Sequence, residues 1–71
     1  MNTMNIHVTI ERTHEKQSLK LKEKSTIKDL LTRLRVNPLT VLPIINGEVV
    51  IEDHIIQDND HVSLKSVISG G

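Results

Sequence analysis

The first residues of the chain alternate strictly between apolar and polar side chains. Apolar residues occupy every second position from Met4 to Ile10. This period of two predicts a β-strand with one buried face. The polar stretch Glu11–Ser18 predicts a turn. A shorter alternation at Leu19–Lys22 predicts a second strand that returns antiparallel to the first.

The pattern changes to the period of a helix over Lys24–Leu34. Apolar residues recur there at spacings of three and four and form one stripe on a helix. The stripe consists of Ile27, Leu30, Leu31 and Leu34. Thr26 and Asp29 have the spacing of a capping box at the helix start. Arg33 and Arg35 are expected in the last turn, where positive charge complements the helix dipole.

A second hairpin is predicted in the middle of the chain. Two apolar runs, Val41–Ile45 and Glu48–Ile51, flank the dipeptide Asn46-Gly47. Because both residues of this dipeptide tolerate positive φ, Asn-Gly between apolar runs is the strongest short-range signal for a tight hairpin. We therefore expect two antiparallel strands joined by a two-residue turn.

The remaining segment contains a polar stretch and a final alternation. Glu52–Asp60 is polar apart from Ile55 and Ile56, which indicates a short helical turn held against the core by these two side chains. Val62–Val67 alternates and predicts a last strand. The order of elements predicts an α+β domain in which one main helix packs on one face of a mixed sheet of about five strands.

The composition narrows the possible functions. The chain has 71 residues, enough for one domain, and it contains no Cys, Phe, Trp or Tyr. Disulfides, cysteine-based metal sites and cysteine nucleophiles are therefore excluded, as is stacking of aromatic side chains on nucleic-acid bases. The formal net charge is zero, so we expect no general attraction to nucleic acid or to a membrane surface. We find no secretory signal and no transmembrane segment, and we expect a cytoplasmic protein.

Polar side chains give no catalytic or metal-binding signature. The spacing of the four histidines matches no zinc motif. Ser63, Ser66 and Ser69 lie near His61, but no nucleophile elbow surrounds any of them. A domain of this size also offers no enclosed pocket from which water is excluded. We expect no bound metal or cofactor and no enzymatic activity of its own.

The two final glycines, Gly70 and Gly71, suggest a different kind of chemistry. Glycines add nothing to a core, but they suit an extended tail that threads a narrow channel in a partner, because another backbone or a nucleotide can approach closely. The reactive group would be the carboxylate of Gly71 after activation by adenylation. A frayed end is the alternative explanation. We expect a folded domain over residues 1–67 and a flexible tail over residues 68–71.

Three segments of the chain carry a resemblance to a known family. They are Thr26–Leu31, the hairpin Ile45–Val50 and the end Asp58–Gly71. Together they resemble the ThiS/MoaD family of ubiquitin-like sulfur carriers, and the ending V-I-S-G-G looks more like ThiS than like MoaD. The resemblance implies a β-grasp fold in which the final strand lies centrally beside the first.

The resemblance also implies a function as a protein co-substrate. An E1-like adenylating enzyme would use ATP and Mg²⁺ to adenylate Gly71, and a sulfur donor would convert the adenylate to a thiocarboxylate. A sulfur-accepting synthase would then use the sulfur in the biosynthesis of thiamine thiazole, molybdopterin or a related product. Two alternatives stay open: a ubiquitin-like modifier conjugated through Gly71 to lysines of target proteins, and a non-catalytic β-grasp adaptor that uses a face of its sheet.

The residues implicated by the resemblance lie in the last strand and the tail. Gly71 and Gly70 form the reactive end. We expect the activating enzyme to recognise the residues just before them, namely Val67, Ile68 and Ser69. Ser63 and Lys65, on the exposed face of the last strand, are expected to form part of the docking surface.

Overall fold

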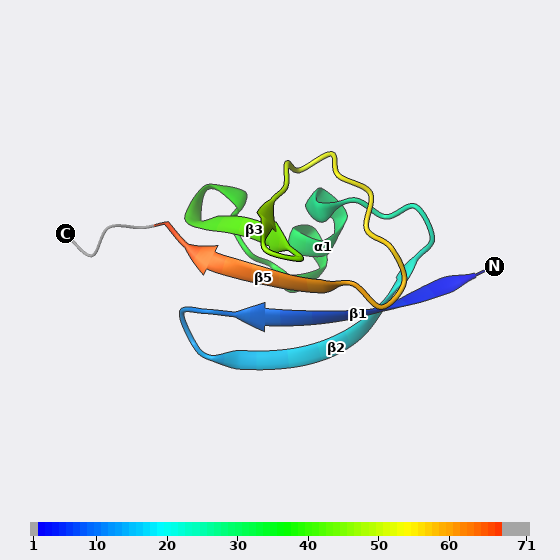
Figure 1. The fold of residues 1–71 in the computed structure, drawn as a ribbon, viewed down its shortest axis with the longest axis horizontal. Helices are drawn as coiled ribbons and strands as arrows, with labels where there is room; N and C mark the ends of the chain where they lie inside the picture. The colour runs from blue at the N-terminus through cyan, green and yellow to red at the C-terminus, as the bar shows by residue number, and fades with distance from the viewer. Residues whose placement is uncertain (1, 68–71) are drawn as a thin grey trace.

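Five strands and one α-helix make up the part of the chain that the computed structural model describes, residues 2–67 (Figure 1). The strands are β1 (Thr3–Ile10), β2 (Glu15–Lys22), β3 (Val41–Ile45), β4 (Glu48–Val49) and β5 (His61–Ser66). The helix α1 spans Ile27–Leu34, and the short 3-10 helix η1 spans Pro38–Thr40. Within residues 2–67, neither helix has the length and apolar character needed to cross a membrane.

The strands form one mixed sheet in the order β2-β1-β5-β3-β4. β1 and β5 pair in parallel, from His7 opposite His61 to Ile10 opposite Leu64. The other neighbouring strands are antiparallel. The final strand therefore lies in the centre of the sheet beside the first, which confirms the predicted α+β class and the β-grasp arrangement.

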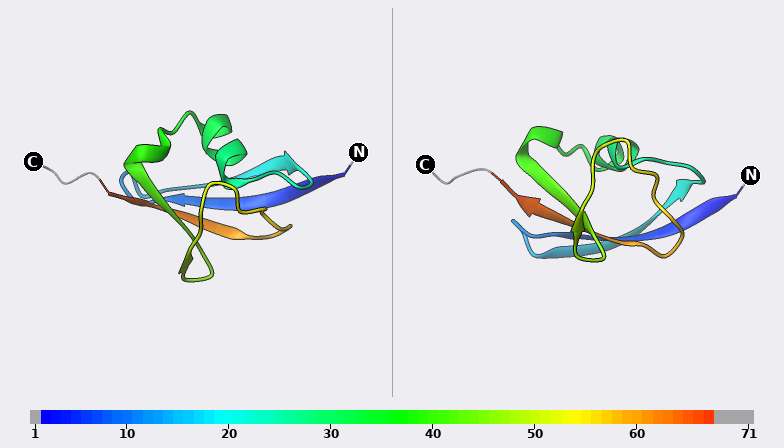
Figure 2. Two further views of the ribbon diagram at one scale, coloured as in Figure 1. Left: turned by 90° about the horizontal axis from the view of Figure 1, so that it is seen from above. Right: turned by 45° about the horizontal axis from the view of Figure 1, so that its top comes forward.

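The helix α1 packs on one face of the sheet and leaves the other face open (Figure 2). The buried cluster between helix and sheet contains only aliphatic side chains and one methionine. Its members are Met4, Ile6, Val8, Leu21, Ile27, Leu30, Leu31, Ile45, Ile56, Val62 and Leu64. The alternation predicted for the first and last strands is confirmed, because the inward-facing positions of β1 and β5 supply five of these residues: Met4, Ile6, Val8, Val62 and Leu64.

The helix is shorter than the sequence pattern predicts. It begins at Ile27 rather than Lys24, because Thr26 is its N-cap and Lys24 has a φ of 68°. The predicted capping box is present: the Thr26 hydroxyl accepts from the Asp29 N–H at 3.3 Å, and the Thr26 N–H donates to the Asp29 carboxylate at 2.9 Å. The placement of Arg35 in the last turn was wrong, since it follows the helix with a φ of 58°.

The segment that follows β4 contains one hydrogen-bonded turn, in which the N–H of His54 donates to the carbonyl of Ile51 at 3.0 Å, but no helix, so the predicted helical turn was wrong. An isolated antiparallel bridge joins Ile55 to Thr26 instead. The segment supplies carbonyl groups to the first turn of α1: the N–H of Ile27 donates to the carbonyl of His54 at 3.0 Å and the N–H of Lys28 donates to the carbonyl of Glu52 at 3.0 Å. The free amides of a helix start need acceptors. A local helix in this segment would have used the same carbonyls internally.

Only one of the two isoleucines in that segment is held in the core. Ile56 is 1% exposed, whereas Ile55 is 48% exposed. The backbone N–H of Ile56 also donates to the carbonyl of Ser25 at 2.9 Å. The prediction that this segment is held against the core is confirmed for Ile56 alone.

Four of the five strands have boundaries that differ from the predicted ones, the smallest difference being that β1 begins at Thr3 rather than Met4. β2 begins at Glu15 rather than Leu19, so the predicted turn contracts to residues 11–14. Residues 15–18 are polar and exposed on both faces of the strand, so the sequence shows no alternation of apolar and polar residues there. β4 ends at Val49 rather than Ile51, and β5 spans His61–Ser66 rather than Val62–Val67. The hairpin turn itself is confirmed, with positive φ at Asn46 and Gly47.

We predict that Leu30→Ala lowers the free energy of unfolding by about 2–5 kcal/mol, because it leaves a cavity in an aliphatic core. Leu30 is 0% exposed. Urea unfolding followed by circular dichroism measures the change. Leu39→Ala is the control, since Leu39 is 85% exposed and its truncation should change stability by less than about 0.5 kcal/mol. Equal effects of the two variants would contradict the packing of α1 on the sheet.

The capping box also predicts a pH dependence of stability. The Thr26 N–H, and after it the Thr26 hydroxyl, donate to the Asp29 carboxylate and hold the pKa of that carboxyl below its ordinary value of 3.8. A carboxyl with a lowered folded-state pKa contributes stability above its unfolded-state value, and this contribution is lost as the pH falls through the folded-state value.

The variant Asp29→Asn should therefore be less stable than the parent chain at pH 7, with a difference that shrinks as the pH falls below 3.8. Asn keeps an acceptor oxygen but has no titrating charge. Urea unfolding midpoints between pH 7 and pH 2 measure the difference, and Asp53→Asn, at an exposed turn, is the control. A difference that does not change with pH would contradict the proposed role of the charge.

Candidate functional site

The central strand β5 carries the chain toward the predicted reactive end. Its side chains alternate between the two faces of the sheet, with Val62 and Leu64 fully buried and Ser63 and Lys65 exposed. β5 is flanked by β1 on one side and β3 on the other. The strand that precedes the tail is therefore held by backbone hydrogen bonds along both edges.

The end of β5 is fixed by two further backbone hydrogen bonds. The carbonyl of Leu64 accepts from the N–H of Glu11 at 3.1 Å. The N–H of Val67 donates to the carbonyl of Thr40, in η1, at 3.1 Å. The side chain of Val67 is 49% exposed. Val67 is thus the point at which the described chain leaves the sheet.

The structure places three of the predicted site residues and leaves the others outside the described part. Ser63, Lys65 and Val67 lie on or directly after β5, and all three are exposed. The predicted reactive and recognition residues Ile68, Ser69, Gly70 and Gly71 lie outside the described residues.

Ser63 and Lys65 belong to a larger surface, the open face, which is the face of the sheet opposite α1 (Figure 2). Strand register places the following residues on it: Thr3, Asn5, His7, Thr9, Lys16, Ser18, Lys20, Lys22, Leu42, Ile44, Val49, His61, Ser63 and Lys65. Its charged residues are all lysines, and its apolar residues gather on β3 and β4. The open face is therefore basic and partly aliphatic, although the chain has a net charge of zero.

Two histidines that lie far apart in the sequence meet on the open face. The parallel register brings His7 beside His61, with ring centroids 4.7 Å apart and an interplanar angle of 19°. His7 Nδ1 lies 3.0 Å from the hydroxyl of Ser18. Among residues 2–67, no group of three His, Cys, Asp or Glu side chains is arranged to hold a metal ion.

A hollow of about 240 Å³ lies where β5 ends, and we call it the tail-base hollow. Its apolar lining consists of Ile10, Val36, Val41 and Leu64, and its polar lining includes Arg12, Arg35, Thr40 and Ser66. Sequence reasoning missed this site. The lining comes from the β1–β2 turn, the segment after α1, η1 and the strands β1, β3 and β5, and no local sequence pattern indicates that these segments converge.

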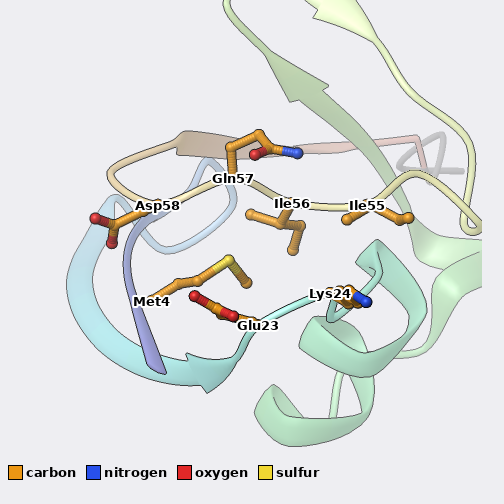
Figure 3. Close-up of a pocket in the computed structure, with 7 residues that line it drawn as sticks. All are labelled: Met4, Glu23, Lys24, Ile55, Ile56, Gln57 and Asp58. Carbon is orange, nitrogen blue, oxygen red and sulfur yellow. The ribbon is translucent and has the colours of Figure 1, made fainter. Parts of the chain in front are cut away.

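A different hollow, of about 200 Å³, lies at the other end of the sheet. The side chains of Met4 and Ile56 reach into it, and Glu23, Lys24 and Asp58 stand at its rim (Figure 3). Met4 is near the start of β1, whereas the chain leaves β5 near the end of β1, because these strands are parallel. This hollow is therefore remote from the tail and carries charges of both signs.

The fold and the exit of the tail from the central strand define a ubiquitin-like β-grasp protein. The ubiquitin of Caldiarchaeum subterraneum has a similar structure, with a TM-score of 0.78, 16% identity, and coverage of 99% of this chain and 100% of that one. A protein from Haloferax volcanii, solved in solution, has a TM-score of 0.75 and 18% identity, with coverage of 97% and 88%. A protein designed on the basis of ubiquitin has a TM-score of 0.77 and 21% identity, with coverage of 96% and 93%.

The family model described as "Small archaeal modifier protein 2" matches residues 4–68. The chain belongs to this family. The match supports the ubiquitin-like part of the resemblance drawn from the sequence, and it points to small modifiers and not specifically to ThiS/MoaD sulfur carriers.

We predict that the amide hydrogen of Val67 is protected from exchange with solvent, because it donates to the carbonyl of Thr40. Hydrogen exchange followed by nuclear magnetic resonance measures the protection. The amide of Leu39 is a useful comparison, since it donates only to the exposed side chain of Asn37 and should exchange faster. Equal, unprotected rates for the two amides would place the end of the folded domain before Val67.

Proposed function

We propose that this chain is a ubiquitin-like protein modifier that is attached through the carboxylate of Gly71 to lysine side chains of target proteins. The observation that carries the proposal is the match to a small modifier family over residues 4–68. The central position of β5 supports it, since a folded domain with the tail leaving from its central strand can present a carboxylate without needing a pocket of its own.

The chemistry requires activation of the carboxylate by a partner enzyme. A carboxylate oxygen of Gly71 attacks the α-phosphorus of ATP, with Mg²⁺ held by the enzyme, and pyrophosphate leaves. The neutral amine of a target lysine then attacks the acyl carbon of the adenylate, AMP leaves, and the nitrogen loses a proton to give an isopeptide bond. In this scheme the chain is a substrate of an E1-like adenylating enzyme and supplies no catalytic group.

Docking on that enzyme would use the surface next to the tail. Ser63 and Lys65 lie on the open face, two strand positions apart, and register places Leu42 opposite Lys65 and Ile44 opposite Ser63. This corner of the open face therefore combines aliphatic contact area with a positive charge. The chain contains no Phe, Trp or Tyr that could serve as an anchor in an interface. Docking would therefore rely on aliphatic contacts and on the charge of Lys65.

A second candidate function is that of a sulfur carrier, which uses the same activated carboxylate. A sulfur donor would attack the acyl adenylate and displace AMP to give a thiocarboxylate, and a synthase would take the sulfur from it for thiamine thiazole, molybdopterin or a related product. Two observations favour this candidate. The ending V-I-S-G-G resembles that of sulfur carriers, and the absence of Cys leaves Gly71 as the place at which sulfur could be carried covalently.

Mass spectrometry of the chain, tagged at its N-terminus and expressed in its source organism, tests both candidates. Trypsin cleaves after Lys65, so a conjugated target should carry the branched remnant Ser66–Gly71 on a lysine. The sulfur carrier instead predicts an intact chain in which one terminal oxygen is replaced by sulfur. Deleting Gly71 should abolish both products, while the urea unfolding midpoint stays that of the parent chain.

Conjugates that persist after deletion of Gly71 would overturn the proposed attachment site. If the parent chain shows neither the branched remnant nor the sulfur-containing end, both candidates fail. The chain would then act as a β-grasp adaptor that uses the open face.

A further inference from the structure

Of the two hollows described above, the tail-base hollow lies closer along the chain to the proposed reactive end. Ser66 lines it, and Thr40, which also lines it, holds Val67 through a backbone hydrogen bond of 3.1 Å. Gly71 is four positions after Val67, so an extended chain between them spans at most about 14 Å. An enzyme that acts on Gly71 must therefore come close to this hollow.

The buried part of the tail-base hollow is lined by apolar side chains, and its exposed part is lined by positively charged ones. Ile10, Val36 and Val41 are half-buried and pack against the core. Arg12 and Arg35 are exposed and are the charged residues of the lining, which includes no Asp or Glu. A guanidinium binds a carboxylate through two parallel hydrogen bonds and also tolerates partial burial. The charge complementarity favours an acidic side chain as the occupant.

The backbone of Arg35 makes its side chain a suitable target for substitution. Arg35 follows α1 with φ 58° and ψ 38°, the left-handed conformation that usually selects glycine at a helix end. A residue with a Cβ atom is strained there by about 1–2 kcal/mol. The cap itself uses only the backbone N–H, which donates to the carbonyls of Leu31 and Thr32. His14 and Lys24 also have positive φ, and a positive charge at Arg35 complements the dipole of α1. Replacing Arg35 therefore changes its side chain without removing the hydrogen bonds of the cap.

We propose that the tail-base hollow receives an Asp or Glu side chain from the enzyme that activates Gly71. Arg35 and Arg12 bind the carboxylate, while the neighbouring aliphatic part of the enzyme packs on Val36 and Val41. This inference rests on the proposed function and adds to it the chemistry of the contact. Because the contact lies beside Val67, it sets the direction in which the tail leaves the domain and so helps to align Gly71 with ATP.

The variant Arg35→Gly separates docking from folding. It removes the guanidinium and relieves the left-handed strain, so the urea unfolding midpoint should stay the same or rise. ATP–pyrophosphate exchange by the purified E1-like adenylating enzyme of the source organism measures activation. We expect the KM for the chain to rise about tenfold or more with little change in kcat, because charge-assisted hydrogen bonds to the enzyme are lost.

Arg12→Ala should raise KM in the same direction, and Arg33→Ala is the matched control. Arg33 is an exposed arginine in the last turn of α1, and it does not line the tail-base hollow. An unchanged KM for both Arg35→Gly and Arg12→Ala overturns the docking inference and leaves the proposed function intact. An absence of exchange with the parent chain overturns both.

The carboxylate of Gly71 in the same chain is the competing occupant of the hollow. Deleting Gly71 should leave the amide chemical shifts of Arg35 and Val36 unchanged in the isolated chain, because in our proposal the carboxylate comes from the enzyme. Shifts in both amides on deletion would show that the tail itself occupies the hollow, and this would overturn the inference.

Discussion

The parallel pairing of β1 with β5 is the constraint on which the rest of the structure depends. Antiparallel neighbours can be joined by a short turn, but parallel neighbours need a crossover that passes over a face of the sheet. Residues 11–60 provide this crossover, and α1 within it covers one face with its apolar stripe. Parallel pairing also brings the ends of β1 and β5 to the same edge of the domain. The β1–β2 turn, with Arg12, therefore lies next to the place where the tail leaves.

A second set of hydrogen bonds joins two parts of the crossover, the start of α1 and the segment between β4 and β5. The first turn of α1 obtains acceptors from Thr26 and from the carbonyls of Glu52 and His54. These hydrogen bonds hold residues 52–54 against the start of the helix, and the buried side chain of Ile56 adds an apolar contact with the core. The segment between β4 and β5 thus leads directly into the central strand, although it forms no helix or strand of its own.

These constraints produce two surfaces with different chemistry around the tail. The open face has lysines, two stacked histidines and an aliphatic corner, whereas the tail-base hollow combines two arginines with aliphatic side chains. The acidic residues of this neutral chain lie outside these two surfaces, in loops, on α1 and on the other face of the sheet. Glu15 and Glu48, for example, are placed by strand register on the face opposite the lysines. A net charge of zero therefore conceals an uneven distribution of charge, with lysines on the open face and arginines in the lining of the tail-base hollow.

The sequence by itself determined the elements whose signals are local. Alternation in β1 and β5, the stripe of α1 with its Thr26–Asp29 box, and the Asn46-Gly47 turn each follow from backbone and packing rules that act over a few residues. The final glycines likewise suggested a reactive carboxylate without any knowledge of the fold. Only the tertiary structure decided the bridge between Ile55 and Thr26, the stacking of His7 on His61 and the position of Arg12 and Arg35 in the lining of one hollow. Each of these depends on contacts between segments distant in the chain, and hydrophobic periodicity contains no information about such contacts.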